Sequence, residues 1–444
     1  MVFSQDYALL ENVGQPVSPR IIPRAEHHIS RSQISPNALK VLYRLHENGY
    51  DAYLVGGGVR DLMLGREPKD FDIATNATPE EVRGLFKNCR LIGRRFRLAH
   101  IRYGREIIEV ATFRAPHDEA EHVDQAHSED GRILRDNVYG TLEQDVWRRD
   151  FTINALYYNI ADFSVVDYTG GVEDLNQGML HLIGDPIERY KEDPVRMLRA
   201  VRFAAKLGFN IDKDSENAIH DLGGLLKNVS PARVFDEMLK LFHGGCAAQT
   251  FELLRHYDLF QYLFPETDAH LDSELGEIML PLISRALNNT DQRIQDGKPV
   301  NPAFLIAILL WHLVVEKQEA IMSNGVPPFP AMQQAGQQVM SAQIRSLSIP
   351  KRFSLVAKEI WIMQLRLPNR RGKRPLVLLA QQRFRAAYDF LCLRGQSGED
   401  ELQEVCEWWT RFQEQNPEDR NSMLRSDKRR KRRPRKRKSR SPDA

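Results

Sequence analysis

The strand-like segments of this 444-residue chain lie in its first part and the helical segments follow. Short runs rich in apolar, β-branched and aromatic residues occur at 52–55, 70–74 and 106–113, and partial alternation in them is typical of half-buried strands. Beyond Pro186, amphipathic helical spacing dominates to about Phe412. Strands followed by helices predict an α+β protein, with a mixed sheet first and all-α regions after it.

A glycine turn lies between the first of these strands and a short helical segment. Gly56, Gly57 and Gly58 follow the strand 52–55, and residues 59–64 have helical spacing. Such a turn lets the backbone approach a ligand, and a helix start offers N–H groups to a phosphate, to which Arg60 could add charge. The spacing is neither the dinucleotide fingerprint nor the Walker loop, so the turn alone does not indicate a phosphate site.

Two aspartates occur two residues apart in the second strand-like run. In a strand, Asp70 and Asp72 would project from the same face, and Phe71 would point the other way into the core. Adjacent carboxylates repel one another, and a divalent metal that bridges them makes the pair useful. On a solvated surface the same pair of carboxylates would have no function.

A third acid, Glu109, lies in the strand at 106–113 between Ile108 and Val110, which face away from it by alternation. Spacing alone leaves two readings equal: a functional carboxylate, or a salt bridge to one of the arginines Arg95, Arg97 and Arg114. Three carboxylates from two strands beside a phosphate-binding turn describe a two-metal phosphoryl-transfer site.

Five segments carry a resemblance to a known family. They are LVGGGVRDLMLG (54–65), KDFDIAT (69–75), IIEVATFR (107–114), RRDFTINAL (148–156) and EDPVRMLRAVRFAAKLGF (192–209). In this order they resemble the branch of the polymerase-beta superfamily that contains tRNA CCA-adding enzymes and bacterial poly(A) polymerases. The motifs cover about residues 50–210, and a fainter helical resemblance continues toward residue 400.

The resemblance implies a nucleotidyltransferase head followed by all-α neck, body and leg regions. The expected ranges are an extended lead-in at 1–30, the catalytic head at 31–185, a neck for base recognition at 186–250, an RNA-binding body and leg at 251–425, and a basic disordered tail at 426–444.

The resemblance also implies roles for single residues. Asp70 and Asp72 would ligate Mg²⁺ in a two-metal site, and Glu109 would be the third catalytic carboxylate. Asp150 is the alternative third acid, and the sequence leaves that choice open. The residues expected to bind the nucleotide are Gly56, Gly57, Arg60, Arg149, Asn154, Asp193, Arg196, Arg199 and Arg202.

The last four of these lie in a segment that in this family replaces a nucleic-acid template. At about 100° per residue, Arg196, Arg199 and Arg202 fall within an arc of roughly 120°, with apolar residues opposite. A solvated basic face is the usual explanation of such an arc, and Phe203 intrudes on it. The family match favours base recognition instead.

Poly(A) addition and CCA addition use the same catalytic parts. LIGRRFRLAHI (91–101) resembles a segment characteristic of bacterial poly(A) polymerases. The basic tail favours the same choice, because a polymerase that acts on many RNAs benefits from sequence-blind phosphate contacts. The formal charge of the chain is +2, yet residues 427–444 hold eleven basic and two acidic residues, so the remaining chain is acidic. The tail residues expected to bind RNA are Lys428, Arg429, Arg430, Lys431, Arg432, Arg433, Arg435, Lys436, Arg437 and Lys438.

The sequence therefore predicts a template-independent poly(A) polymerase that transfers AMP from ATP to RNA 3′ ends. In bacteria the resemblance implies that such tails promote RNA decay and that decay-machinery proteins are partners. The alternatives are a tRNA CCA-adding enzyme and an inactive nucleotidyltransferase fold that binds RNA, against which the intact set of carboxylates argues.

The cysteines and the apolar stretches bear on the compartment. Cys89, Cys246, Cys392 and Cys406 lie far apart, without the CxxC spacing of a zinc site or redox pair, which favours a reducing cytosol. The longest apolar stretch, 303–315, is shorter than the ~20 residues of a membrane-spanning helix. The amino terminus lacks the pattern of a signal peptide. We therefore expect a cytoplasmic protein without a transmembrane segment.

Overall fold

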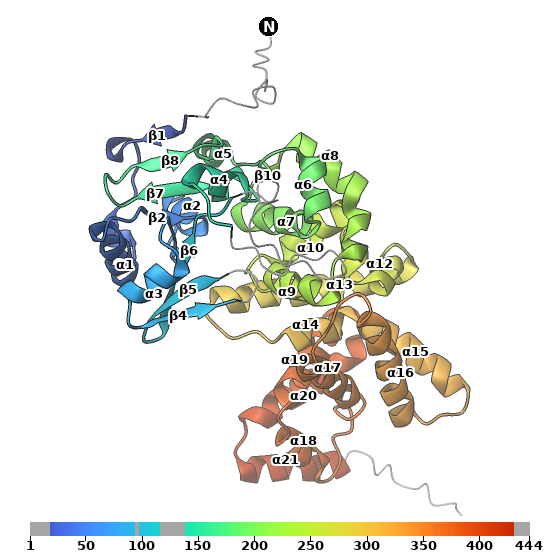
Figure 1. Cartoon of the computed structure of the whole chain (residues 1–444). Coiled ribbons are helices and arrows are strands. Elements are labelled where there is room, and N and C mark those ends of the chain that lie inside the picture. Colours follow the sequence, from blue (N-terminus) through green and yellow to red (C-terminus); the bar gives the residue numbers. More distant parts are fainter. Residues whose placement is uncertain (1–17, 94–96, 116–137, 430–444) are drawn as a thin grey trace, which may run out of the picture. The chain divides into compact units, whose positions relative to one another are not determined.

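The computed structural model describes residues 18–93, 97–115 and 138–429 (Figure 1). These residues form two compact units. The first comprises the described residues up to Arg196 together with Leu207–Ile219, and the second comprises Met197–Lys206 and the residues from His220 onward. The five domain ranges expected from the sequence stay predictions.

The first unit contains a mixed eight-stranded sheet in the order β1-β8-β7-β2-β3-β6-β5-β4, which Figure 1 shows from β1 at the top to β4 at the bottom. β3 and β6 run parallel, and the other neighbours in this sheet are antiparallel. The strands are β1 (Arg20–Ile22), β2 (Ala52–Val55), β3 (Asp72–Thr75), β4 (Cys89–Ile92), β5 (Leu98–Tyr103), β6 (Glu106–Thr112), β7 (Leu156–Asn159) and β8 (Val165–Asp167). The expected α+β fold with a mixed sheet is confirmed.

Side-chain caps begin two of the helices that lie against this sheet. Ser35 caps α1 (Pro36–Glu47) by accepting from two backbone N–H groups, and Thr78 forms a capping box with Glu81 at the start of α3 (Pro79–Leu85). α1 and α3 pack on the sheet and on each other, and α2 (Gly57–Met63) packs on β2 and β7. The other helices that begin in this unit or run on from it are α4 (Leu142–Trp147), α5 (Gly171–Gln177), α6 (Pro186–Glu192), α7 (Val195–Leu207) and α8 (Lys213–Leu222); β9 (Met179–Leu180) pairs in parallel with β10 (Asn210–Ile211).

Among its described residues the second unit contains helices and no strand, in agreement with the all-α regions expected after the sheet. Its further α-helices are α9 (Pro231–Phe242), α10 (Ala247–His256), α11 (Phe260–Leu263), α12 (Pro265–Leu271), α13 (Glu274–Gln295), α14 (Pro302–Leu309), α15 (Trp311–Ser323), α16 (Pro328–Gln343), α17 (Lys351–Gln364), α18 (Arg374–Leu379), α19 (Phe384–Gln396), α20 (Gln403–Glu414) and α21 (Pro417–Arg429). Among the described residues, no helix is both long and apolar enough to span a bilayer.

Three local expectations differ from the structure. Asp70 and Phe71 precede β3, which begins at Asp72, so strand alternation does not relate the two aspartates. The polar and acidic segment 116–145 also predicts a mobile loop, yet residues from Leu142 onward form α4; residues 116–137 lie outside the described part of the chain. α21 continues to Arg429, four residues into the segment expected to be a disordered tail.

Two of the four cysteines form a disulfide, although their spacing favoured a reducing compartment. Cys392 in α19 and Cys406 in α20 are bonded, with their Cα atoms 5.1 Å apart. The two helices pack against each other around the short turn of η6 (Asp400–Leu402), which brings residues 14 positions apart into contact. Cys89 and Cys246 are free. The cysteine argument for a reducing compartment therefore fails for this pair.

Candidate active site

One row of paired residues across the sheet carries the candidate catalytic acids, and it is called the acidic row below. Asp72 on β3 lies opposite Glu109 on β6, and Glu109 lies opposite His100 on β5. On the other side of Asp72 the row continues through Val55 on β2 to Tyr157 on β7. Because residues opposite one another project from the same face of a sheet, Asp72, Glu109 and His100 are side by side.

The acids in this row are crowded. Asp72 has solvent on its outer side, but the protein around its carboxyl desolvates it, and the nearby charges of Glu109 and Asp70 add to this effect. Together these causes raise the pKa of Asp72 to about 6, although Arg149 acts in the opposite direction. Crowded negative charge of this kind is relieved by a bound cation.

Glu109 contacts a histidine on the neighbouring strand β5. His100 Nε2 lies 3.1 Å from Glu109 Oε1. Ile108 and Val110 are buried on the opposite face, as alternation predicted. Of the three arginines considered as partners, Arg97 pairs with Glu80 instead, and Arg95 lies outside the described residues.

The glycine turn adopts a backbone that favours glycine. Gly56 has φ of 66°, in the left-handed region, and caps α2. A Cβ on Gly56 would lie 3.4 Å from an Arg149 guanidinium nitrogen. The turn therefore packs directly on the motif that contains Arg149.

Arg60 is buried beneath this turn rather than directed outward. It is 3% exposed, and its Nε and Nη2 donate to Asp61 while Nη1 donates to Asn154 Oδ1 at 2.7 Å. In this arrangement Arg60 ties α2 to Asn154, which lies in η4 (Thr152–Asn154). The two expected nucleotide ligands thus contact each other.

Arg149 is part of a buried network with Tyr157 and Asp145. Its Nε donates to Tyr157 Oη at 2.6 Å and its Nη2 to Asp145 at 3.2 Å, and the tyrosine hydroxyl donates to the same Asp145 oxygen. Burial lowers the pKa of Arg149, but Tyr157 and Asp145 outweigh it and the net shift is upward. The arginine is therefore a fixed cation beside the acidic row.

Asp150 occupies a different position from the acidic row. Its Oδ1 accepts from the backbone N–H of Phe151 at 2.9 Å and from Asn154 Nδ2 at 3.2 Å. Asp150 lies just before η4 and outside the strands of the sheet, whereas Glu109 lies opposite Asp72 within it.

Asp193 and Arg196 lie at the junction of α6 and α7. Asp193 Oδ1 accepts from the backbone N–H of Val195, and Arg196 donates to Glu192 Oε2 at 2.7 Å. The same Glu192 oxygen accepts from Arg189, which also donates to the backbone oxygens of Arg148 and Arg149. Within the first unit, Glu192 and Arg189 therefore connect this junction to the motif at 148–156.

Arg199 and Arg202 belong to the second unit and share an aromatic ring. Both guanidinium groups lie over buried Phe203, at 5.4 and 4.3 Å from its centroid. Arg202 also donates to Glu237, whose carboxylate is 4% exposed. Phe203 is a platform for the two arginines, and not an interruption of the basic face.

The expected RNA-binding tail is described only at its start. Lys428 and Arg429 end α21, and the residues from Arg430 to Lys438 lie outside the described part of the chain.

The donor set suits Mg²⁺ in part. Among the described residues no group of three or more His, Cys, Asp or Glu side chains is already arranged around an ion position. Mg²⁺ characteristically takes one or two carboxylates, substrate phosphates and retained waters, so it does not need such a preformed cage. The crowded carboxylates of Asp70 and Asp72 fit that requirement.

Several residues that position this site were missed from the sequence. They are His100, Asp145, Tyr157 and Arg189, which contact the expected residues from other strands and helices. His100 lies within the quoted segment 91–101, and that segment was the available signal. The other three pairings depend on the fold.

Family models match three parts of the chain. They are described as "Poly A polymerase head domain" at residues 52–181, "Probable RNA and SrmB- binding site of polymerase A" at 208–271 and "Polymerase A arginine-rich C-terminus" at 324–442. Similar proteins include Poly(A) polymerase I of Salmonella typhimurium, 50% identical over 94% of this chain and 92% of the relative. The CCA-adding enzyme of Lactobacillus helveticus is 40% identical over 49% of this chain and 52% of its own.

The fold has solved counterparts. The crystal structure of the Bacillus stearothermophilus CCA-adding enzyme in complex with CTP matches with a TM-score of 0.58 and 25% identity, over 85% of this chain and 82% of that one. The sheet, the acidic row and these similarities define an enzyme of the nucleotidyltransferase class. Within that class the chain belongs to the bacterial poly(A) polymerase I family.

Proposed function

We propose that this protein is a template-independent poly(A) polymerase that transfers AMP from ATP to RNA 3′ ends and releases pyrophosphate. The observation that carries the proposal is the extent of the match. Similarity to a poly(A) polymerase I runs over 94% of the chain, whereas similarity to a CCA-adding enzyme covers 49%. The acidic row of Asp72 and Glu109 supplies the means for phosphoryl transfer.

In this proposal Asp70 and Asp72 hold Mg²⁺ in a two-metal site. Bound Mg²⁺ neutralises charge on the phosphates and makes a hydroxyl a better nucleophile. Glu109 is the third carboxylate, since it lies opposite Asp72, and His100 fixes its position. Asp150 orients Asn154 and the turn that follows it.

The nucleotide is held by the remaining predicted residues. Backbone N–H groups at Gly56 and Gly57 face the phosphates, and Arg149 supplies a fixed positive charge beside them. Arg60 and Asn154 hold this turn in place. Asp193 and Arg196 offer hydrogen bonds to the incoming base, and Arg199 and Arg202 extend the basic face of the same helix.

The setting of the reaction follows from the family. We propose that the tails promote RNA decay in the cytoplasm, with decay-machinery proteins as partners, and that the basic tail from Lys428 to Lys438 binds RNA phosphates. The domain ranges 1–30, 31–185, 186–250, 251–425 and 426–444 belong to the same proposal.

CCA addition to tRNA is the second candidate, and the likeness to a CCA-adding enzyme structure over 85% of the chain favours it. The test offers an unstructured RNA primer and a tRNA that ends before its CCA, each with Mg²⁺ and with ATP, CTP or both. Long ladders on the primer with ATP alone support the proposal. A stop after CCA on the tRNA supports the second candidate, and no addition to either RNA supports an inactive RNA-binding fold.

A further inference from the structure

The chain is strongly basic from the end of α17 to the start of α18 (Figure 1). Residues 360–388 contain seven lysine and arginine residues and no acidic residue, although the chain outside its basic tail is acidic. Five of the seven lie within residues 366–374, which we call the basic segment; they are Arg366, Arg370, Arg371, Lys373 and Arg374. A cluster of positive charge on an otherwise acidic chain attracts a polyanion.

Three of these cations are available to a ligand. Arg371, Lys373 and Arg374 are exposed, and none of them forms an ion pair within the described part of the chain. The acids around the segment are each bound to another arginine: Glu359 to Arg383, Asp389 to Arg385 and Glu404 to Arg370. The Cα atoms of Arg371 and Arg374 are at most about 11 Å apart, which is about one Debye length at 0.1 M salt, so the three charges act together.

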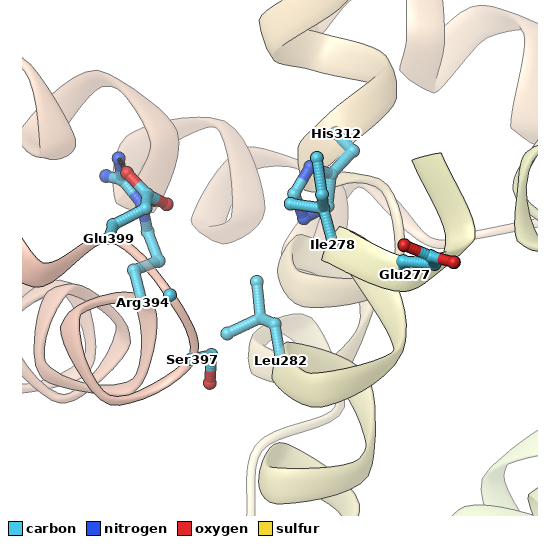
Figure 2. A pocket seen from close by; sticks show the side chains of 8 residues that line it. Glu277, Ile278, Leu282, His312, Arg394, Ser397 and Glu399 are labelled. Atoms are coloured by element: carbon cyan, nitrogen blue, oxygen red, sulfur yellow. Dashed lines mark hydrogen bonds and ion pairs between the residues drawn. The ribbon is translucent and has the colours of Figure 1, made fainter. Parts of the chain in front are cut away.

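Arg394 of the same helical unit shows the contrasting case. It lines a cavity with Leu282 and Ser397, where Figure 2 shows Glu399 beside it. Its Nε donates to one Glu399 oxygen at 2.7 Å and its Nη2 donates to the other, while its Nη1 donates to Gln364 at 3.1 Å. An arginine neutralised in this way does not attract a phosphate. The basic segment, and not this cavity, is therefore the candidate site for an anionic ligand.

Helix α20 holds the basic segment in a fixed shape. Trp409 Nε1 donates to the backbone oxygen of Leu367 at 2.9 Å, and both residues are fully buried. Arg370 Nη2 lies 3.2 Å from Glu404 Oε1, and its guanidinium is 5.7 Å from the centroid of the Trp408 ring. Because this backbone is held in place before a ligand arrives, binding costs less ordering entropy. The exposed cations thus project from a preorganised scaffold.

Arg366 adds a flat group to the cations. Its guanidinium lies over the ring of Phe329, 5.0 Å from the ring centroid, and both side chains are exposed. A hollow of about 290 Å³ lies beside Arg366, with Met363, Gln381 and Gln382 in its lining. Bases of single-stranded RNA stack on aromatic rings and on arginine planes, whereas an acidic peptide needs only the charge. A flat group beside unpaired cations therefore favours RNA over an acidic protein.

We infer that the basic segment binds single-stranded RNA. Arg371, Lys373 and Arg374 contact neighbouring phosphates, and Arg366 stacks on one base. The inference rests on the proposed function, because that function places RNA on the protein. Such contacts read no base edge, so they suit a polymerase that acts on many RNA 3′ ends. The site belongs to the folded helical unit and shares no residue with the acidic row or with the tail from Lys428 onward.

The test compares two triple variants of the full-length protein that remove the same charge. One carries Arg371→Gln, Lys373→Gln and Arg374→Gln, and the control carries Arg285→Gln, Lys317→Gln and Arg345→Gln at exposed cations elsewhere in the helical unit. The affinity for a fluorescent 15-nucleotide oligo(A) is measured without ATP at several salt concentrations.

The two triple variants should differ in the salt dependence of binding. Each phosphate contact on a single strand contributes about 0.7 to the slope of log K against log salt, and so about fivefold to the affinity at 0.1 M salt. The variant of the basic segment should therefore show a slope shallower by about 2, and it should bind roughly 100-fold more weakly at 0.1 M salt. The control should stay close to the wild type.

A single substitution tests the stacking contact. Arg366→Lys keeps the charge and removes the flat group, so it should weaken oligo(A) binding about tenfold and leave the salt slope unchanged. A strand of the same length without bases should bind this variant and the wild type equally. Arg352→Lys, at an exposed arginine that lies over Phe353, is the matched control and should keep the wild-type affinity.

Four outcomes would contradict the inference. An unchanged slope and affinity in the variant of the basic segment overturns it, and so does an equal loss in both triple variants, which would reflect net charge alone. Loss of poly-glutamate binding with unchanged oligo(A) binding would assign the segment to an acidic protein. Wild-type oligo(A) affinity in Arg366→Lys would overturn the contact with a base.

AMP incorporation by the wild type, measured on the same preparation, tests the proposed function separately. Its absence would overturn that function even where oligo(A) binding follows the expected pattern. Incorporation together with an unchanged salt slope in the variant of the basic segment would overturn the inference alone.

Discussion

His100 Nε2 lies 3.1 Å from Glu109 Oε1, and the two residues face each other across β5 and β6. The histidine side chain is 15% exposed and the glutamate side chain is 47% exposed, so the more enclosed residue holds the more accessible one. Glu109 in turn lies opposite Asp72. The geometry makes His100 a positioning residue for the third carboxylate.

Replacing His100 by alanine should lower kcat for AMP incorporation about 10- to 100-fold, the usual cost of removing a group that orients a catalytic ligand. The KM for ATP should change little. His100→Gln, which keeps a donor, should recover part of the rate. His46→Ala, at an exposed histidine of the same unit, is the control. Equal losses in the glutamine and alanine variants would contradict a positioning role.

Removal of either aspartate should abolish catalysis and spare RNA binding. Asp70→Ala and Asp72→Asn should each reduce incorporation at least about 1,000-fold, because the stabilisation that a metal gives to phosphate charge amounts to several kcal/mol. RNA affinity, measured without ATP, should stay within about twofold. Asp51→Asn, an exposed aspartate just before β2, should be fully active. Retained incorporation in both variants would remove the metal-site proposal.

The sequence predicted the local elements of the catalytic unit well, because they depend on short-range chemistry. The strands at 52–55 and 106–113 and the buried side chains of Ile108 and Val110 follow from the alternation of apolar residues. The relation of Asp70 to Asp72 was wrong, since strand pairing begins only at Asp72.

The contacts between distant segments could not be predicted. Asp145 and Tyr157 meet Arg149 because α4 and β7 pack together, and no spacing in the sequence encodes that approach. The disulfide between Cys392 and Cys406 was missed for a similar reason: the turn between α19 and α20 decides it. Likewise the motif presents Arg60 as a charge that could reach a phosphate, yet Arg60 is buried, pairs with Asp61 and donates to Asn154.

The disulfide predicts a stability difference. Cys392→Ser should lower the free energy of unfolding of the helical unit by about 3 kcal/mol, since the bond closes a loop of roughly 15 residues in the unfolded chain. Urea unfolding under oxidising conditions measures this. Reductant should produce the same loss in the wild type and none in the variant. Cys89→Ser, which removes a free cysteine, should stay as sensitive to reductant as the wild type. If reductant leaves the free energy of unfolding of the wild type unchanged, the bond does not form.

The pH dependence of stability should report the pair of His181 and Asp174. His181 Nδ1 lies 2.8 Å from Asp174 Oδ1, and this hydrogen bond, with burial opposing it, raises the pKa of the histidine. The charged imidazole is thus favoured in the folded state. Its stabilisation is complete below the unfolded pKa of about 6.5 and is lost as the pH rises through the higher folded value.

The unfolding free energy of the wild type should therefore exceed that of His181→Gln by more at pH 5.5 than at pH 8.5. Urea titrations at several pH values give the difference directly. His46→Gln, at an exposed site of the same unit, is the matched control. A difference that grows toward high pH would mean that the folded state favours the neutral ring.

The basic tail predicts a change in the salt dependence of RNA binding. A chain that ends at Ser426 lacks Lys428 to Lys438, whose positive charges would release counterions from RNA phosphates. On single strands each such contact contributes about 0.7 to the slope of log K against log salt. The truncated protein should therefore bind RNA more weakly at low salt, with a shallower slope, because fewer cations are displaced. The rate of adding a single AMP to a saturating short primer should stay within about twofold of the wild type, since the acidic row is unchanged.

Replacing the same lysines and arginines by glutamine in the untruncated chain separates the effect of charge from that of length. This variant should show the same shallow slope. A slope that remains steep would place the phosphate contacts elsewhere in the protein.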